Sequence, residues 1–373
     1  MTTSTAQKVP DLLASGERPS VTIVIVPRER FSCTQRSLES VLAQTQYPYR
    51  LIYVDGNSPP PVRDYLQQQA IAHSFQLLRT EYYPYPNHAR NLGLAQVETE
   101  YVVFLDNDVI VSPNWLTSLV ECAETTGAAV VGPLMCQYEP VHEVVHFAGG
   151  ESHIWTDKVG QQRLREKMYH QGKQVTSVRD RLDQGQTELA EFHCVLVRQS
   201  IFDQLGSLDE AMLNTKEHLD FCMSVRQLGG TVYFEPDSVV TYVPGPPLER
   251  SDLHFYMLRW SDAWTLRSLE RLRNKWDLAE DSYFKTKYKK LKKGWRRRAT
   301  IISPFVTKLT LGQGSGKIES LLVKPERMLN RLLTSRHAKH HAAHRQDPQR
   351  VRQSSIDSYA SSTDRHAKEH AYK

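Results

Sequence analysis

Two aspartates, Asp106 and Asp108, are separated by one residue and directly follow an apolar run at residues 101–105. A short run rich in β-favouring residues predicts a buried parallel strand, and open α/β sheets bind ligands beyond the carboxyl ends of such strands. Two carboxylates at that edge offer hard oxygen ligands to a divalent cation, Mn²⁺ or Mg²⁺, that carries phosphates. The competing interpretation is an acidic turn after the strand, and other motifs in the chain are needed to distinguish it from a metal site.

The elements that would position these aspartates alternate between strand and helix. Leu38, Val41 and Leu42 recur at helical spacing between the first two apolar runs, as expected for a crossover helix. Strands are predicted at residues 21–26, 51–54, 75–78, 101–105 and 128–132, and further helices at 62–73, 87–95 and 115–126. This alternation favours an α/β fold with a doubly wound parallel sheet.

The pattern is less regular in the second half of the chain. Residues 133–188 lack a clear periodicity, and so long an irregular stretch predicts a functional insertion or a β-rich flap. Strands are expected again at 192–198 and at 231–234, the latter closed by Pro236, with a helix at 217–226 and a helical pattern at 252–280. We therefore predict a flexible N-terminal tail (1–20), an α/β domain (21–247), a helical basic extension (248–335) and a disordered polar tail (336–373).

Composition limits the class of protein. The chain has 373 residues, 40% of them hydrophobic, and a net charge of +5, with the basic residues crowded into the last hundred positions. Its five cysteines show no C-x-x-C pair, which argues against a disulfide framework or a zinc site and favours a reducing, cytoplasmic location. No apolar run is long enough to span a bilayer, so we expect a soluble or peripheral protein.

Five motifs in order resemble those of glycosyltransferase family 2 over about residues 21–243. They are Val-Asp-Gly-Asn-Ser at 54–58, Ala-Arg-Asn-Leu-Gly at 89–93, Phe-Leu-Asp-Asn-Asp at 104–108, Leu-Val-Arg to Leu-Asp-Glu at 196–210, and Glu-His-Leu-Asp with Arg226 at 217–226. The resemblance implies a GT-A fold and an inverting enzyme that transfers a sugar from a nucleotide-diphosphate donor to an acceptor hydroxyl.

The same resemblance implies roles for individual residues. Asp108, with Asp106, would bind the metal ion, and Asp106 would also contact the nucleotide sugar, as would the four further residues Asp55, Asn57, Arg90 and Asn91. For Asp55 the alternative is an Asx turn before the three prolines. For Arg90 it is a salt bridge within the sheet.

Inversion needs one general base to remove the acceptor proton, and here the sequence departs from the family pattern. His218 occupies the position of the usual aspartate, between Glu217 and Asp220. Helical spacing places Glu217 and Asp220 on one face with His218 about 100° away, so we rank Glu217 first as the base. His218 could instead be the base, a metal ligand or a pocket lining, and capping of the helix could explain all three.

A second departure concerns the residue after the last strand. Related enzymes often carry a histidine ligand there, whereas this chain has Tyr242. Glu191 and His193 alternate on the preceding strand and could face the acceptor.

The basic run from Lys285 to Arg298 contains nine lysines or arginines and no acid. Four aromatic or leucine residues recur within it at helical spacing, which fits a helix on an anionic membrane surface. Nucleic acid is a less favoured partner, and packing of this stripe on the catalytic domain is the competing interpretation. Those four residues are Phe284, Tyr288, Leu291 and Trp295.

Two other patterns carry less weight. The glycine-rich segment 312–317 is one residue short of a phosphate-binding loop and is interpreted as a linker. The histidines of the tail could capture a metal only adventitiously.

The leading functional hypothesis is a metal-assisted glycosyltransferase for a polysaccharide, glycolipid or other envelope acceptor. A non-catalytic or regulatory nucleotide-sugar-binding protein is the alternative, because His218 and Tyr242 replace expected groups. A nucleotidyltransferase of similar fold is a weaker third possibility.

Overall fold

Apolar, β-branched runs build the central sheet. In the computed structural model, which describes residues 19–244, 248–345 and 352–354, Val21–Val26 forms the fully buried strand β1. It pairs in parallel with strands on both sides, in the register Ile23↔Leu51 and Ile23↔Val103. The other central strands are β2 (Arg50–Gly56), β3 (Gln76–Thr80), β4 (Tyr101–Asp106), β6 (Val130–Gln137), β11 (Cys194–Arg198) and β12 (Val232–Tyr242).

The central order is β12-β6-β11-β4-β1-β2-β3, and only β11 among these strands runs against the rest. The predicted α/β fold with a mostly parallel sheet is therefore confirmed. β11 is reversed because the chain reaches it from the long insertion and not through a crossover helix. Short strands add antiparallel pairs, among them β5 (Val109–Val111) on β12 and β13 (Arg352–Ser354) on β3.

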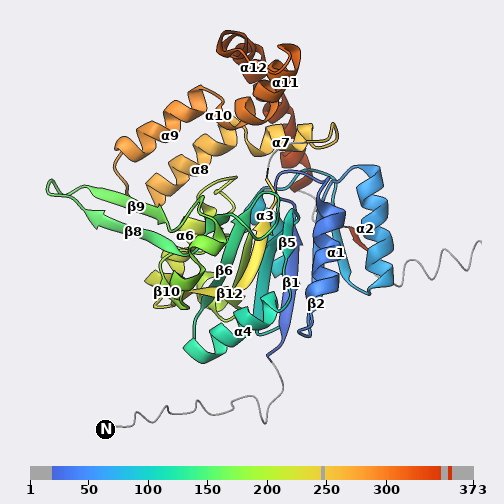
Figure 1. Ribbon diagram of the computed structural model, residues 1–373, viewed down its shortest axis with the longest axis vertical. Helices are drawn as coiled ribbons and strands as arrows, with labels where there is room; N and C mark the ends of the chain where they lie inside the picture. Colours follow the sequence, from blue (N-terminus) through green and yellow to red (C-terminus); the bar gives the residue numbers. More distant parts are fainter. Residues whose placement is uncertain (1–18, 245–247, 346–351, 355–373) are drawn as a thin grey trace, which may run out of the picture.

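Helices flank the sheet (Figure 1). They are α1 (Thr34–Gln44), α2 (Pro60–Ala72), α3 (Pro86–Leu94), α4 (Trp115–Thr126), α5 (Ile201–Leu205) and α6 (Glu217–Gln227). Gly93 allows α3 to approach β1 closely, since a Cβ there would lie 2.2 Å from Val24 Cγ1.

The irregular stretch contains the β-rich flap that the sequence predicted. A hairpin of β8 (Gly150–Thr156) and β9 (Gln162–Met168) projects from the sheet, as Figure 1 shows, with β7 (Val145–Phe147) and β10 (Gly185–Thr187) at its base. Two 3-10 turns, Val175–Ser177 and Arg179–Arg181, complete it. The prediction that Pro236 ends the last strand is wrong, because β12 continues past it through a register shift between Glu235 and Val239. A bulge tolerates proline, which donates no ladder hydrogen bond.

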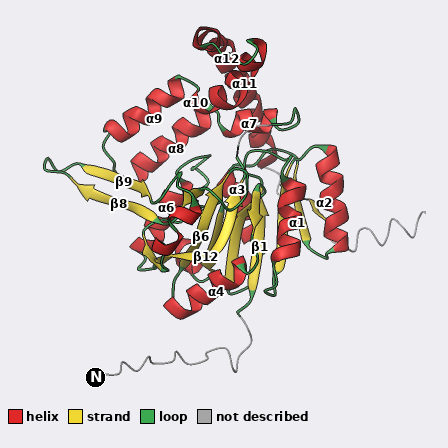
Figure 2. Cartoon of the chain, in the orientation of Figure 1, coloured by secondary structure: helices red, strands yellow, loops and turns green. Residues whose placement is uncertain are grey.

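The C-terminal extension is helical, as predicted, and lies beyond the carboxyl ends of the parallel strands (Figure 2). It consists of α7 (Leu253–Arg259), α8 (Asp262–Lys275), α9 (Ser282–Lys292), α10 (Trp295–Arg297), a π-helical turn (Arg298–Ile302), α11 (Ser303–Leu309) and α12 (Gly316–Arg345). Within the described ranges no helix combines the length and apolarity needed to cross a bilayer.

Two sequence predictions for this region need correction. Residues 336–345 are the end of α12, with His337 and His341 buried, so a disordered tail starting at residue 336 is wrong for them. The rest of that predicted tail, apart from β13, and residues 1–18 of the N-terminal tail lie outside the described residues. The expectation that the whole aromatic stripe faces a membrane is wrong, because Phe284 is 1% exposed and Tyr288 packs against the main core, whereas Trp295 is 48% exposed. Membrane contact through the basic residues 285–298 stays a prediction.

Candidate active site

Three strands bring functional side chains to one edge of the sheet. Arg28 follows the end of β1, Asp106 ends β4, and His193 precedes β11 directly opposite Asp106, whose backbone N–H donates to the His193 carbonyl at 3.0 Å. A cavity of about 40 Å³ lies there. Its lining comprises Arg28, Arg90, Asp106, Glu191, Phe192, His193, Asn214, Thr215, Lys216, Glu217, His218 and Trp260.

Asp106, Asp108 and His193 form a group that could hold a metal ion, since one potential ligand atom from each lies within 4.8 Å of the others. Both carboxyl oxygens of Asp108 are buried without a hydrogen-bond partner among the described residues. Burial, then the nearby Glu29 and Asp106 carboxylates, raise the pKa of Asp108 well above its usual value. Arg30 and Arg28 oppose this rise but do not outweigh it, and a divalent cation would supply the missing positive charge.

His193 fits the same cation. Its Nδ1 lies 2.9 Å from Asp106 Oδ2 but makes no hydrogen bond. Burial, followed by the charge of Arg28, lowers the pKa of His193 well below its usual value, so the ring is neutral and able to bind metal. The ring stacks on Tyr242 at 4.0 Å between centroids. His193, on the adjacent β11 side, could thus supply an imidazole in place of the one that the sequence lacks at position 242.

Arginines compensate the remaining carboxylates. Asp106 accepts a hydrogen bond from Arg90 Nη2 at 3.2 Å and lies 3.3 Å from Arg28 Nε. Glu217 Oε1 lies 3.9 Å from Arg28, 3.9 Å from Arg90 and 3.5 Å from Arg259. Burial lowers the pKa of Arg90, although its carboxylate partners oppose the shift. The salt bridge considered for Arg90 is therefore present, and Glu217 balances three guanidinium groups.

The remaining predicted nucleotide contacts have structural partners and do not line the cavity. Asp55 accepts hydrogen bonds from Arg79 and from the Ser58 backbone, which forms the Asx turn. Asn57 has a left-handed φ of 64° and accepts a weak hydrogen bond from Arg79. Asn91 binds the backbone of Leu208 through both amide atoms, at 2.9 and 3.0 Å.

Sequence comparison decides the family. Residues 22–206 match the sequence model of the family described as "Glycosyl transferase family 2". This stretch of the chain is a glycosyl transferase family 2 domain. It contains the end of β4 and the Asp106–Asp108–His193 group, while α6 lies just beyond the matched range.

Relatives and solved structures were compared with the whole chain. The succinoglycan biosynthesis protein ExoM of Rhizobium meliloti (strain 1021) is 34% identical over 116 residues, which are 30% of this chain and 37% of that protein. The pre-mycofactocin glycosyltransferase of Mycobacterium tuberculosis is 26% identical over 224 residues, covering 60% and 42%. The chain thus spans less than half the length of these relatives. A mannosyltransferase from Pyrobaculum calidifontis, solved with GDP-Man and Mn²⁺, matches with a TM-score of 0.46 at 14% identity, covering 86% of this chain and 85% of that one.

The start of α6 borders the family 2 domain but does not present its residues as predicted. His218 Nε2 lies 3.4 Å from Glu191 Oε1 in the cavity, and Glu217 lines the same cavity. Asp220 instead accepts hydrogen bonds from Lys275 and Trp276 at 2.8 Å each, away from the cavity. The shared face of Glu217 and Asp220 therefore does not bring both carboxylates into the cavity, whereas His218 does line it.

Burial reverses the usual order of the pKa values of Glu191 and His218. It raises the pKa of Glu191 to about 8. Burial, followed by the charge of Lys216, lowers the pKa of His218 well below its usual value. Around neutral pH the histidine is therefore neutral, while the Glu191 carboxyl is largely protonated.

The C-terminal extension closes the site against the family 2 domain. Trp260 Nε1 donates to Glu29 at 2.8 Å, and Arg296 donates to Glu29 at 3.3 Å and to the Tyr242 hydroxyl at 3.1 Å. Burial favours the neutral form of Glu29, but Arg296 and Arg28 outweigh it and lower the pKa of this carboxyl. Arg28 was not predicted from the sequence, where its position directly after β1 is the one signal for it. The contacts of Trp260 and Arg296 have no local signal in the sequence.

Proposed function

We propose that the protein is an inverting, metal-assisted glycosyltransferase that moves a sugar from a nucleotide-diphosphate donor to a hydroxyl of an envelope glycoconjugate. The observation that carries the proposal is the pair of unpartnered Asp108 oxygens beside Asp106 and His193 within a family 2 domain. A cation at this position would have one nitrogen and several oxygen ligands, which suits Mn²⁺ better than the oxygen-preferring Mg²⁺. Five buried, free cysteines favour a reducing compartment such as the cytoplasm.

Charge stabilisation on the donor side falls to the metal ligands and the arginines. Asp106, Asp108 and His193 would hold the cation, which when bound neutralises charge on the departing nucleotide diphosphate. Arg28 lies beside Asp106 and lines the cavity. Burial would lower the pKa of Arg28, but the Asp106, Tyr242 and Glu217 groups outweigh that effect and raise it, so its charge is fixed. Arg28 would therefore bind the diphosphate, while Arg90 keeps Asp106 in place.

On the acceptor side we assign the general base to His218. The neutral ring would take the hydroxyl proton, and Glu191, at 3.4 Å, would orient it. Glu217 is less suited to this role because its Oε1 atom already lies 3.9 Å from Arg28, 3.9 Å from Arg90 and 3.5 Å from Arg259. Asp220 is assigned to holding α6 against Lys275.

A second cavity, of about 240 Å³, offers a path for the acceptor. It shares Thr215, Lys216 and Trp260 with the cavity at the metal group, so the two adjoin. Lys290 and Trp295 also line it. Indole rings suit sugar faces and ammonium groups suit anions, so this lining favours an acceptor glycan that carries a negative charge.

The decisive experiment is donor turnover with and without Mn²⁺ in the wild type and in Asp108→Asn, after screening nucleotide sugars for thermal stabilisation. We expect donor hydrolysis or transfer to fall by roughly 100-fold or more in the variant, because a catalytic metal is worth several kcal/mol in the transition state. Mn²⁺ binding measured by calorimetry should be lost as well. The metal-free variant should unfold at a higher temperature than the metal-free wild type, since an amide replaces a carboxyl whose charged form is disfavoured by burial and by Glu29 and Asp106.

Asp203→Asn provides the control, because Asp203 is an exposed carboxylate on α5. It should leave metal binding, turnover and stability unchanged. Donor binding without any turnover in the wild type would support the non-catalytic alternative, whereas full activity of Asp108→Asn would exclude the proposed metal site.

A further inference from the structure

Exposed apolar side chains concentrate at one end of the molecule. Nine of the fifteen large apolar side chains that are exposed in the described residues lie between Trp295 and Leu332. Such a concentration marks an interaction surface more often than a plain solvated face. The nine are Trp295, Phe305, Leu309, Leu311, Ile318, Leu321, Met328, Leu329 and Leu332.

The outward face of α12 combines apolar and basic residues. Leu321, Met328 and Leu332 are 71%, 67% and 49% exposed and follow one another at intervals of seven and four, so they form one stripe along the helix. Lys324 and Arg331, also seven residues apart, lie beside that stripe.

The acidic residues of α12 lie on the other side of the helix. Glu319 is 3.8 Å from Arg298 and Glu326 is 2.6 Å from Arg297, so both carboxylates pair inward with the neighbouring helical turns. The outward face is left with an apolar stripe that has a cationic edge.

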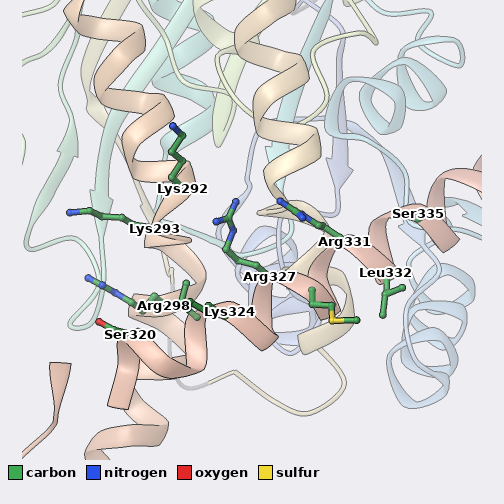
Figure 3. A pocket seen from close by; sticks show the side chains of 11 residues that line it. Lys292, Lys293, Arg298, Ser320, Lys324, Arg327, Arg331, Leu332 and Ser335 are labelled. Atoms are coloured by element: carbon green, nitrogen blue, oxygen red, sulfur yellow. The ribbon is translucent and has the colours of Figure 1, made fainter. Parts of the chain in front are cut away.

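A cavity of about 840 Å³ opens between α12 and the end of α9 (Figure 3). Figure 3 shows Arg327 and Arg331 on α12 and Lys292 and Lys293 on the adjacent helix end, around the same hollow. Its lining contains six basic residues, five other residues and no acid: Lys292, Lys293, Arg298, Ser320, Val323, Lys324, Arg327, Met328, Arg331, Leu332 and Ser335. Arg298 and Arg327 pair with carboxylates outside that lining, so most of the charge is available to an anion.

We propose that α11, α12 and this cavity dock on an anionic phospholipid bilayer. Headgroup phosphates would enter the cationic cavity, and the apolar stripe with Phe305 and Leu309 would reach the boundary of the acyl chains. This surface uses the end of the basic run, namely Lys292, Lys293 and Arg298, but its apolar stripe lies on α12 and not on the buried Phe284. The inference does not depend on the transfer reaction proposed above.

Charge and side-chain type favour a bilayer over other occupants. Two copies of this chain related by a two-fold axis would bring the same face of each together, and the Lys324 and Arg331 charges would repel. Nucleic acid would meet the cations, but the neighbouring side chains Leu321, Met328 and Leu332 are aliphatic and cannot stack on bases as aromatic residues do. Mixed cationic and aliphatic surfaces match phosphate headgroups above hydrocarbon.

Vesicle sedimentation of the full-length protein tests the proposal. We expect binding to vesicles of phosphatidylglycerol and phosphatidylcholine, weakening with added salt, and little binding to phosphatidylcholine alone. Charge reversal in Lys324→Glu with Arg331→Glu should reduce the partition coefficient by roughly tenfold or more, because basic residues near the surface contribute separately. Leu321→Gln with Met328→Gln should weaken binding as well and make the remainder more sensitive to salt.

Matched controls use exposed residues elsewhere on the surface. Lys158→Glu with Lys173→Glu reverses two exposed charges of the insertion, and Ile71→Gln removes an apolar side chain that is 54% exposed on α2. Both should bind vesicles like the wild type, and circular dichroism should show that every variant is folded. Equal binding to neutral and anionic vesicles, or unchanged binding of the Lys324 and Arg331 variant, would overturn the proposal. A wild-type dimer in light scattering that becomes a monomer in the Leu321 and Met328 variant would also overturn it. Donor turnover should be the same in the wild type and in all of these variants.

Discussion

His218 illustrates how the surroundings of one residue decide its chemistry. On the sequence it appears as a substitution in a motif that should carry an aspartate, and helical spacing turns it away from Glu217 and Asp220. In the structure its Nε2 lies 3.4 Å from Glu191 Oε1, and burial followed by the charge of Lys216 keeps the ring neutral near neutral pH. The neutral ring would have a lone pair for the acceptor proton, whereas Glu217 lies among three arginines.

Replacing His218 should therefore affect catalysis more than binding. We expect His218→Ala to lower kcat by roughly 10²–10⁴-fold, the usual contribution of general base catalysis, with little change in donor affinity. His218→Asp should recover part of the rate. Because burial lowers the pKa of His218 well below its usual value, protonation of this ring should cause no loss of wild-type kcat/KM as pH falls from 8 to about 6.5. A change of kcat/KM with a pKa near 8 would report Glu191 instead. Rates of His218→Ala within tenfold of the wild type across that range would assign the base elsewhere.

At the scale of elements, the contact of α3 with β1 fixes the position of Arg90. A Cβ on Gly93 would lie 2.2 Å from Val24 Cγ1, a distance at which one of the two elements has to move. The glycine of the Ala-Arg-Asn-Leu-Gly motif is thus required for packing, and the motif's arginine reaches Asp106 because the helix lies this close to the sheet.

Gly93→Ala should destabilise the protein by about 1–3 kcal/mol, the usual cost of overpacking a core, and should weaken Mn²⁺ binding through the displaced Arg90. Denaturant unfolding and metal titration measure the two effects. Adding Val24→Ala should restore much of the stability, because it removes the clashing methyl group. Gly316→Ala, where a Cβ would meet nothing within 4 Å, should be neutral. A Gly93→Ala protein as stable as the wild type would contradict this account of the contact.

Elements with a local signal were predictable from the sequence. The run at 21–26 and the helix at 115–126 were placed with their observed ends, and Asp106 and Asp108 were found because an apolar strand runs straight into them. His193 was placed on the acceptor side and not at the metal group, because the reversal of β11, which sets it opposite Asp106, arises from pairing between distant strands. Contacts such as Arg296 with Glu29 join residues 267 positions apart and leave no periodic trace in the sequence.

At the scale of the whole molecule, the C-terminal helices pack against the family 2 domain through buried aromatic and histidine side chains. His337 on α12 is 6% exposed and lies 5.4 Å from Trp264 of α8 and 6.1 Å from Tyr85 between ring centroids. The neighbouring His341 lies 4.8 Å from Tyr82. A helix that carries the proposed membrane surface is thereby tied to the segment before α3, close to the motif that holds Arg90.

This attachment should weaken in acid. Burial, then the nearby His341, lower the pKa of His337 to about 3, below its unfolded value of about 6.5. The unfolded or released state therefore binds the extra proton between these two values, and the stabilisation present above pH 6.5 is lost progressively as pH falls. Hydrogen exchange of α12, corrected for intrinsic rates, should rise between pH 7 and pH 5 by more than in His337→Phe, which keeps a ring but cannot titrate. His73→Phe, at an exposed position after α2, should retain the wild-type pH dependence. If His337→Phe and the wild type loosen equally, the acid sensitivity of α12 comes from other groups and His337 is only a packing residue.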